Sequence, residues 1–183
     1  MFSNDELVEA LQGKSVTLNA KIMLDDPKFQ AMVDAIFNGP RRGKRTREMV
    51  EQNTLQGKMC ELACFQLTGV PYEWNNFDVK NRKSYAVDLE AFNIRCEIKS
   101  VKPAHNVLYL PESAYKTLRN NIKTKNIDSL IACEYEVDGN EWTIRPKWII
   151  NPTTIGEYIE DSKYGFQYDV PTAIRFNDTI SIQ

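Results

Sequence analysis

The segment SYAVDLEAFNIRCEIK, residues 84–99, predicts a β-hairpin that decides the fold. In its second half, Ile94, Cys96 and Ile98 alternate with charged residues, so apolar side chains share one face and charged side chains share the other. A two-residue turn at positions 92–93 fits, because its second residue is an asparagine, which tolerates the left-handed conformation that such turns need. We therefore expect two antiparallel strands with one buried face and one charged face.

This register places two acids opposite each other. Asp88 faces Glu97, with Cβ atoms about 4.5–5.5 Å apart, and like charges in such a pair destabilise a hairpin unless a cation lies between them. Closer to the turn, Glu90 faces Arg95, which we interpret as an ordinary cross-strand pair of opposite charges. Two carboxylates and a backbone carbonyl, here that of Ile98, form a good oxygen site for Mg²⁺, for which Mn²⁺ is expected to substitute.

Lys99 lies one step beyond Glu97 on the charged face. An ammonium group beside a metal-bound water can orient or deprotonate it, or stabilise the negative charge that develops on a reacting phosphate. The single histidine, His105, excludes a multi-histidine metal site and argues against a Ser-His-Asp enzyme, so carboxylates and lysines must carry any chemistry. These features indicate phosphodiester hydrolysis. The alternative is that Asp88, Glu97 and Lys99 are solvated charges or surface salt bridges.

The spacing of these residues resembles the PD-(D/E)XK nucleases, a superfamily that includes restriction endonucleases, λ-type exonucleases and junction resolvases. Asp88 is followed, after eight residues, by Glu97-Ile98-Lys99, while Val87 stands where the family name has proline. The resemblance implies a restriction-endonuclease-like α/β core, in which helices flank a central mixed sheet in the order helix, strand, strand, strand, helix, strand. It also implies a glutamate from the first helix near the metal. Glu61 fits that place, and Gly57, one turn earlier, would leave room beside it.

The rest of the chain supplies the elements that such a core needs. Apolar periodicity and capping residues predict helices over residues 4–12, 26–37, 46–68, 111–122 and 152–159. Runs of β-branched and aromatic residues predict strands over 72–80, 84–90, 94–101, 127–137, 141–150 and 172–182, with a hairpin turn at Asp138-Gly139. A chain of 183 residues is expected to form one nuclease domain. Its core would span about 46–150, with a helical N-terminal addition (1–43) and a C-terminal addition (151–183).

A run of basic residues precedes the longest predicted helix. The net charge is −2, yet five of the seven residues from 41 to 47 are basic: Arg41, Arg42, Lys44, Arg45 and Arg47. Such a run can contact the phosphates of a nucleic acid, or it can be an ordinary solvated loop. Lys102 and His105, which follow the predicted active strand, are further candidates for contact with DNA.

Composition narrows the class of protein further. The four cysteines form no C-x-x-C pair, so we expect reduced, mostly buried thiols rather than a zinc site at Cys60, Cys64, Cys96 and Cys133. No apolar run approaches the roughly 18 residues needed to cross a bilayer. Acids stand near the N-terminus, where a signal peptide has basic residues. The protein is therefore expected to be cytoplasmic and to have no membrane partner.

The sequence therefore favours a magnesium-dependent DNA endonuclease. Asp88, Glu97 and Glu61 would hold the metal, and Lys99 would position or activate the water. The alternative is a catalytically inactive nucleic-acid-binding or protein-interaction module on the same fold, and a weaker third interpretation is an exonuclease or junction-cleaving relative. The compact size would suit a phage or mobile-element nuclease acting in a bacterial cell. The sequence leaves open whether the substrate is DNA or RNA, and whether the protein forms a homodimer.

Overall fold

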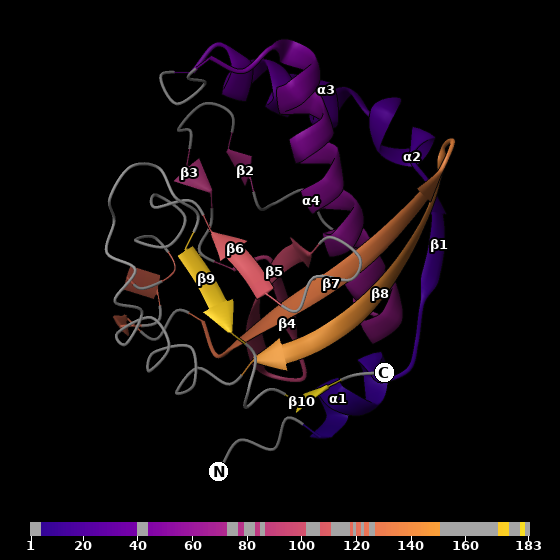
Figure 1. Cartoon of the computed structure of the whole chain (residues 1–183), viewed down its shortest axis with the longest axis vertical. Helices are drawn as coiled ribbons and strands as arrows, with labels where there is room; N and C mark the ends of the chain where they lie inside the picture. Colours follow the sequence, from indigo (N-terminus) through magenta and orange to yellow (C-terminus); the bar gives the residue numbers. More distant parts are fainter. Residues whose placement is uncertain are drawn as a thin grey trace.

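The centre of the computed structural model is a mixed β-sheet with helices packed against it (Figure 1). The structure describes residues 5–39, 44–72, 77–78, 83–84, 87–101, 107–110, 118, 120–121, 123–124, 127–150, 172–175 and 180–181. The helices are α1 (Asp5–Leu11), α2 (Lys21–Leu24), α3 (Pro27–Phe37) and α4 (Arg47–Thr68). The central sheet contains β1 (Val16–Asn19), β4 (Leu89–Ala91), β5 (Ile94–Val101), β7 (Ser129–Asp138), β8 (Glu141–Ile150) and β10 (Ile180–Ser181). Two separate ladders pair β2 (Phe77–Asp78) with β3 (Lys83–Ser84), and β6 (Val107–Leu110) with β9 (Thr172–Arg175).

The strands of the central sheet lie in the order β1-β8-β7-β5-β4, and β10 pairs with β8 beyond the end of β1. The β5–β7 pair is parallel, whereas the other neighbouring pairs in this sheet are antiparallel. The predicted α/β fold with a mixed sheet is therefore confirmed at this coarse level. The detailed order differs from the prediction. Within the region 72–80 the described strand is β2, which pairs with β3 outside the central sheet, and an edge of that sheet is taken by β1, which the sequence analysis did not predict.

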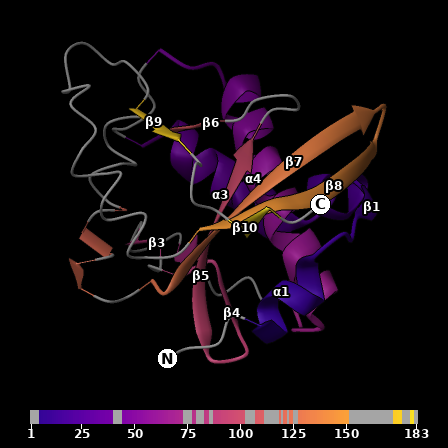
Figure 2. The same ribbon diagram turned by 60° about the horizontal axis from the view of Figure 1, so that its bottom comes forward.

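The long helix α4 confirms the helix predicted over residues 46–68, and it lies across one face of the sheet (Figures 1 and 2). Thr46 caps its start, because the side-chain oxygen accepts a hydrogen bond from the N–H of Met49 at 3.2 Å. Gly69 ends the helix in the left-handed conformation, with a φ of 73°. Among the residues that α4 buries, one is charged, Glu61. The helix therefore carries a carboxylate into the region where it meets the sheet.

The N-terminal helices begin and end close to their predicted residues. Helix α1 spans 5–11, against a prediction of 4–12, and α3 spans 27–37, against 26–37. Asp26 caps α3 by accepting the N–H of Lys28 at 2.7 Å, and Pro27 occupies the first position, where its missing N–H costs nothing. Apolar residues of both helices belong to the same core as α4. The N-terminal addition is therefore part of the packed domain.

The longest strands, β7 and β8, form a curved hairpin whose tip reaches toward α2 (Figures 1 and 2). Its turn comprises residues 139–140, one residue later than predicted, and Gly139 has the positive φ, 59°, that glycine adopts without strain. The N–H of Ala20 donates to the carbonyl of Asn140 at 2.7 Å, which holds the tip in place. A β-bulge skips Lys147 in the ladder with β7, beside Pro146, which has no N–H to donate.

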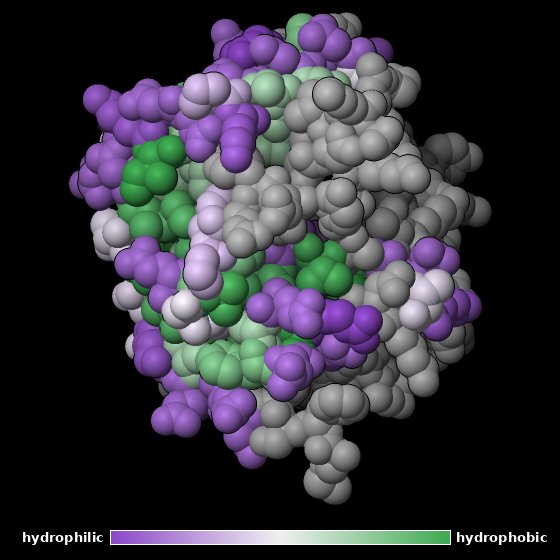
Figure 3. All heavy atoms as spheres, turned by 180° about the vertical axis from the view of Figure 1, so that it is seen from behind, coloured by the Kyte–Doolittle hydropathy of each residue, from purple (hydrophilic) through white to green (hydrophobic). Residues whose placement is uncertain are grey.

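The hydrophobic core lies between the sheet and the helices α1, α3 and α4. The four cysteines are free and buried, as predicted, and the Sγ atoms of Cys64 and Cys133 lie 3.5 Å apart. On the face opposite to that of Figure 1, hydrophobic atoms reach the surface in patches between hydrophilic side chains (Figure 3). The large apolar side chains exposed in the described residues belong to separate parts of the fold: Ile22, Met49, Phe92 and Val137.

Other predicted elements fall partly outside the described residues. Of the helix predicted over 111–122, Leu118, Asn120 and Asn121 are helical, while the helix predicted over 152–159 lies wholly outside. The strand predicted over 172–182 corresponds to the two short strands β9 and β10. None of the described helices is long and apolar enough to cross a bilayer.

Candidate functional site

The β4–β5 hairpin has the predicted register around the predicted turn. The paired residues are Leu89 with Cys96, Glu90 with Arg95, and Ala91 with Ile94. The turn residues Phe92 and Asn93 both have positive φ, 53° and 61°, as a type I′ turn requires. Along β5, the side chains from Ile94 to Ile98 alternate between buried and partly exposed positions. The hairpin therefore separates the apolar face from the charged face as the sequence predicted.

Asp88 takes a different role from the one predicted for it. The ladder ends at the pair of Leu89 and Cys96, so Asp88 and Glu97 do not pair within it. Instead, the N–H of Asp88 donates to the carbonyl of Cys96 at 3.0 Å, and Oδ2 of Asp88 accepts the N–H of Ile98 at 2.8 Å. The N–H and carbonyl of one strand residue point to the same edge, so the carbonyl of Ile98 also faces the edge where Asp88 lies. Beyond the end of β4, Asp88 thus supplies the hydrogen-bond partners that a neighbouring strand would otherwise give to this edge of β5.

Glu97 and Lys99 lie on the partly exposed face of β5, two residues apart. Their side chains are 17% and 26% exposed, and the ammonium group of Lys99 donates a hydrogen bond to Oε1 of Glu97. Both positions follow from the alternation of a strand whose other face is buried. The predicted acid and lysine are therefore brought together, with Asp88 at the adjacent edge.

Helix α4 supplies two more charged residues. Glu61 is buried, and its Oε2 lies 2.5 Å from Nζ of Lys58, three residues earlier on the same helix. The side chains of Lys58 and Glu61 are only 12% and 10% exposed. The sequence analysis did not assign Lys58 to the site. Its i, i+3 spacing from Glu61 was the available signal, since residues three apart on a helix are neighbours.

The pKa values show that these five residues share one electrostatic environment. Burial and then the charge of Asp88 raise the pKa of Glu61, Lys58 and Lys99 oppose the rise, and the net pKa is about 7. Burial and then the charge of Asp88 also raise the pKa of Glu97. For Lys99, burial acts to lower the pKa, but Asp88 and Glu97 outweigh it, so the pKa is raised. We refer to Lys58, Glu61, Asp88, Glu97 and Lys99 as the acid–lysine cluster.

Neighbouring contacts fix the two elements that carry the cluster. Nε2 of Gln56 on α4 donates to Oγ of Ser100 on β5 at 2.5 Å. Tyr72, just beyond α4, packs edge-on against Phe65 with ring centroids 5.1 Å apart. Burial, and then the charge of Glu61, raise the pKa of Tyr72, so its hydroxyl stays protonated beside the cluster. The helix and the strand that carry the charged side chains are therefore hydrogen-bonded to each other through Gln56 and Ser100.

The donor atoms of the cluster suit a divalent metal, although their arrangement does not yet form a metal site. Carboxylate oxygens are the ligands that Mg²⁺ prefers, and a cation would relieve the repulsion that Asp88 exerts on Glu61 and Glu97. In the described part of the chain, however, no group of three or more His, Cys, Asp or Glu side chains could hold a metal ion. Glu61 and Glu97 are ion-paired to lysines instead. A metal would therefore have to compete with Lys58 and Lys99.

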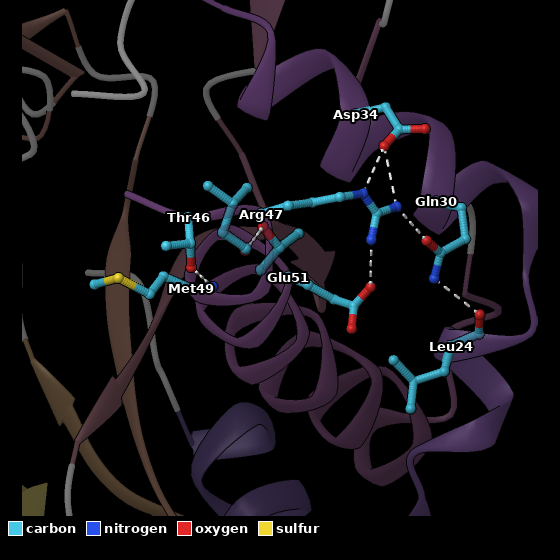
Figure 4. A network of polar contacts seen from close by, with 9 residues as sticks. Leu24, Gln30, Asp34, Thr46, Arg47, Met49 and Glu51 are labelled. Carbon is cyan, nitrogen blue, oxygen red and sulfur yellow. Dashed lines mark hydrogen bonds and ion pairs between the residues drawn. The ribbon is translucent and has the colours of Figure 1, made fainter. Parts of the chain in front are cut away.

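The basic run before α4 divides into residues with different roles. Arg47 is a structural residue, because its guanidinium contacts Asp34 at 3.0 Å, Glu51 at 3.1 Å and Oε1 of Gln30 at 2.9 Å, which ties α3 to α4 (Figure 4). Its charge is thus already compensated by protein groups. Lys44 is exposed and Arg45 is partly exposed. The other predicted contacts to nucleic acid, Arg41, Arg42, Lys102 and His105, lie outside the described residues.

Arg95 has a different main partner from the one predicted. It stands opposite Glu90 in the ladder, but its guanidinium forms two hydrogen bonds to Asp128, at 2.8 and 2.9 Å. The backbones of Arg95 and Asp128 are bonded as well, since the N–H of Asp128 donates to the carbonyl of Arg95 at 2.8 Å. We call this pair the Arg95–Asp128 clamp. It joins the start of β5 to the start of β7 and lies outside the acid–lysine cluster.

Comparison of the chain with protein-family models, with curated proteins and with solved structures gives no match in any of the three. The resemblance to PD-(D/E)XK nucleases therefore rests on the residues of this chain alone.

Proposed function

We propose that this protein is a metal-dependent deoxyribonuclease, an endonuclease that hydrolyses phosphodiester bonds of DNA with Mg²⁺ on a core of the restriction-endonuclease type. The observation that carries this proposal is the acid–lysine cluster. Three carboxylates and two ammonium groups share one partly buried environment, and the charge of Asp88 raises the pKa of the other two acids. Such repulsion is a cost to the folded protein, and carboxylates with raised pKa values in one place are characteristic of functional sites.

Each residue of the cluster has a role in the proposed reaction. Asp88, Glu97 and Glu61 would bind the metal, together with the carbonyl of Ile98, which faces the edge of β5 where Asp88 lies. The bound Mg²⁺ would supply an activated water and neutralise charge on the phosphate. Lys99, held by Glu97, would orient the attacking water and stabilise the negative charge that develops on the phosphate. Cations of the basic run would contact the DNA backbone; among the described residues, Lys44 is exposed and Arg45 is partly exposed.

One observation favours a second candidate function, a catalytically inactive module that binds nucleic acid or a protein. Glu61 and Glu97 already have lysine partners, so the cluster can be read as a set of internal ion pairs. The repulsion that Asp88 exerts on Glu61 and Glu97 argues against this interpretation, because ion pairs that serve only the fold do not need carboxylates that raise each other's pKa.

The test is incubation of the purified protein with supercoiled plasmid and with linear DNA, with Mg²⁺, with Mn²⁺ and with excess chelator. The proposal predicts nicked or linear products from the plasmid with either metal, and intact plasmid in chelator. Products from linear DNA ends alone would indicate an exonuclease. Binding without cleavage under every condition would support the inactive module, and full cleavage in chelator would contradict a metal-dependent mechanism.

A further inference from the structure

The residue of the cluster that the proposed reaction leaves unexplained is Lys58. Its side chain is 12% exposed, and its Nζ lies 2.5 Å from Oε2 of Glu61. In the described part of the chain, Glu61 is the carboxylate within ion-pair distance of Lys58. The charge of Lys58 also lowers the pKa of both Glu61 and Glu97. The ammonium group of Lys58 therefore binds the same carboxylate, that of Glu61, that the proposed metal would bind.

A divalent cation bound to Glu61 would not tolerate an ammonium group in the same contact. The repulsion between them grows with the product of the charges, and it is weakly screened in a site shielded from solvent. Lys58 must then move away from Glu61 to another anion. Gly57, four residues before Glu61 on the same side of α4, has open space where a Cβ atom would stand, so no side chain at that position closes the approach to Glu61.

We propose that Lys58 is an exchangeable counter-ion: it holds Glu61 in the metal-free protein, competes with the divalent cation for that carboxylate, and contacts a phosphate of the substrate once the cation has displaced it. This inference rests on the proposed function. To that function it adds a coupling between metal binding and DNA binding, because the bound metal releases Lys58, which then strengthens the binding of the substrate. Metal and DNA would consequently bind more tightly together than separately.

The test compares Lys58→Met with Lys147→Met. Lys147 is a matched control, because it is ion-paired at 2.9 Å with its side chain 22% exposed, but its partner is Glu134 on β7 and no residue of the cluster. Mg²⁺ affinity is measured by isothermal titration calorimetry at pH 8.5. Lys58→Met should bind Mg²⁺ about tenfold more tightly than wild type, because a competing charge is removed, and Lys147→Met should not change. Removing the ammonium also strengthens the binding of a proton to Glu61, but a divalent ion gains about twice as much as a proton does.

Binding to DNA provides a second readout. A short fluorescent duplex with phosphorothioate linkages, which resist hydrolysis, is titrated by anisotropy over a range of salt concentrations. With Mg²⁺ present, Lys58→Met should bind the duplex more weakly than wild type does. The slope of log affinity against log salt concentration should be smaller by about 0.9, which corresponds to the loss of one phosphate contact. In chelator the slope should equal that of wild type, because Lys58 is then held by Glu61. Lys58→Arg, which keeps the charge, should retain the slope in Mg²⁺.

The outcomes separate this inference from the function on which it rests. If Lys58→Met folds, by circular dichroism, but binds Mg²⁺ as wild type does or more weakly, Lys58 does not compete with the metal and the inference fails while the nuclease proposal stands. A loss of slope in chelator as well as in Mg²⁺ would make Lys58 a permanent phosphate contact and would also overturn the exchange. If Lys58→Met does not fold, the Lys58→Gln variant is measured in its place. Wild-type protein that neither binds Mg²⁺ nor cleaves DNA overturns both proposals together.

Discussion

The two ends of strand β5 hold charge in opposite ways. In the Arg95–Asp128 clamp, one guanidinium meets one carboxylate, about a third of each side chain is exposed, and hydrogen bonding to Arg95 lowers the pKa of Asp128. In the acid–lysine cluster, burial and the charge of Asp88 raise the pKa of Glu61 and Glu97. Each partner of the clamp thus favours the charged form of the other, while the acids of the cluster disfavour each other's charge.

This difference separates a structural ion pair from a candidate functional site on the same strand. The clamp joins β5 to β7 and is complete as it stands. In the cluster, the charge of Asp88 raises the pKa of two neighbouring acids on elements that are otherwise well packed, and a folded protein keeps such repulsion at a cost in free energy. We therefore expect substitutions in the clamp to affect stability, and substitutions in the cluster to affect activity.

The largest effect is expected for Asp88→Asn. The amide oxygen can still accept the N–H of Ile98, so the edge of β5 should stay folded, while the charge needed to bind a cation is lost. Turnover on plasmid DNA with Mg²⁺ should fall about 10³-fold. Asp128→Asn is the matched change in the clamp and should leave turnover near wild type but lower Tm by about 2–4 °C. Equal losses of turnover in both variants would remove the distinction between the two ends of β5.

The contrast also shows what the sequence could and could not predict. The hairpin register was predictable because a two-residue turn and the alternation of apolar residues admit one pairing, and the structure has it. The partner of Arg95 could not be predicted in this way. Asp128 lies 33 residues away, at the start of the parallel strand β7, whereas the local pattern favours Glu90 on the opposite strand of the hairpin. Parallel neighbours are set by the whole fold, so their contacts leave no local signal.

Two other features escaped prediction for related reasons. The burial of Lys58 depends on how closely α4 approaches the sheet, which the i, i+3 spacing from Glu61 does not reveal. Strand β1 has only four residues, and it is extended because the edge of β8 pairs with it, from Val16 opposite Ile144 to Asn19 opposite Glu141. Conversely, Glu61 lies within the helix predicted over residues 46–68, and helical periodicity puts it beside the apolar stripe of α4, where the structure buries it.

A second, smaller effect on turnover should distinguish two acids of the same helix. Glu61→Gln keeps the shape of the buried side chain but removes its charge, so turnover should fall about 10²-fold while DNA affinity stays within about twofold of wild type. Glu51→Gln is the control, because Glu51 is also ion-paired on α4, to Arg47, but lies outside the cluster. It should retain wild-type turnover. Wild-type turnover in Glu61→Gln would remove Glu61 from the site and leave the assignment of Asp88, Glu97 and Lys99 standing.

The pH dependence of stability should differ between the cluster and the clamp. The pKa of Glu61 is raised from 4.5 to about 7, so between these values the folded protein binds more protons than the unfolded chain, and its free energy of unfolding falls as pH rises. The fall should be on the order of 2 kcal/mol in chelator. The clamp acts with the opposite sign, because the lowered pKa of Asp128 stabilises the fold above pH 3.8 and this stability is lost as pH falls through the folded-state pKa.

Urea unfolding in chelator from pH 8 down to about pH 2 measures both effects, because the contribution of the clamp is lost only below pH 3.8. Glu61→Gln should flatten the decline between pH 4.5 and 7 that Glu61 causes in the wild type. Added Mg²⁺ should raise stability most at the high end of this range, where Glu61 is ionised and can bind the ion. A wild-type profile that rises with pH over the same range would show that Glu61 is ionised without strain, and the contrast with the clamp would disappear.

The smallest effect concerns the glycines of α4, and it tests whether the space beside the cluster belongs to the fold or to a ligand. Gly57 lies inside the helix, where glycine is less stable than alanine, and a Cβ atom there meets no described atom within 4 Å. Gly57→Ala should therefore raise the free energy of unfolding by about 0.5–1 kcal/mol. Gly69→Ala is the control, since Gly69 also has open space around it but a φ of +73°, so the same change should destabilise the protein. A destabilised Gly57→Ala protein would mean that the fold itself requires the gap. If Gly57→Ala is stabilised but cleaves DNA more slowly, the gap beside Lys58 serves the substrate, because a methyl group that the folded protein accepts can then obstruct only a bound ligand.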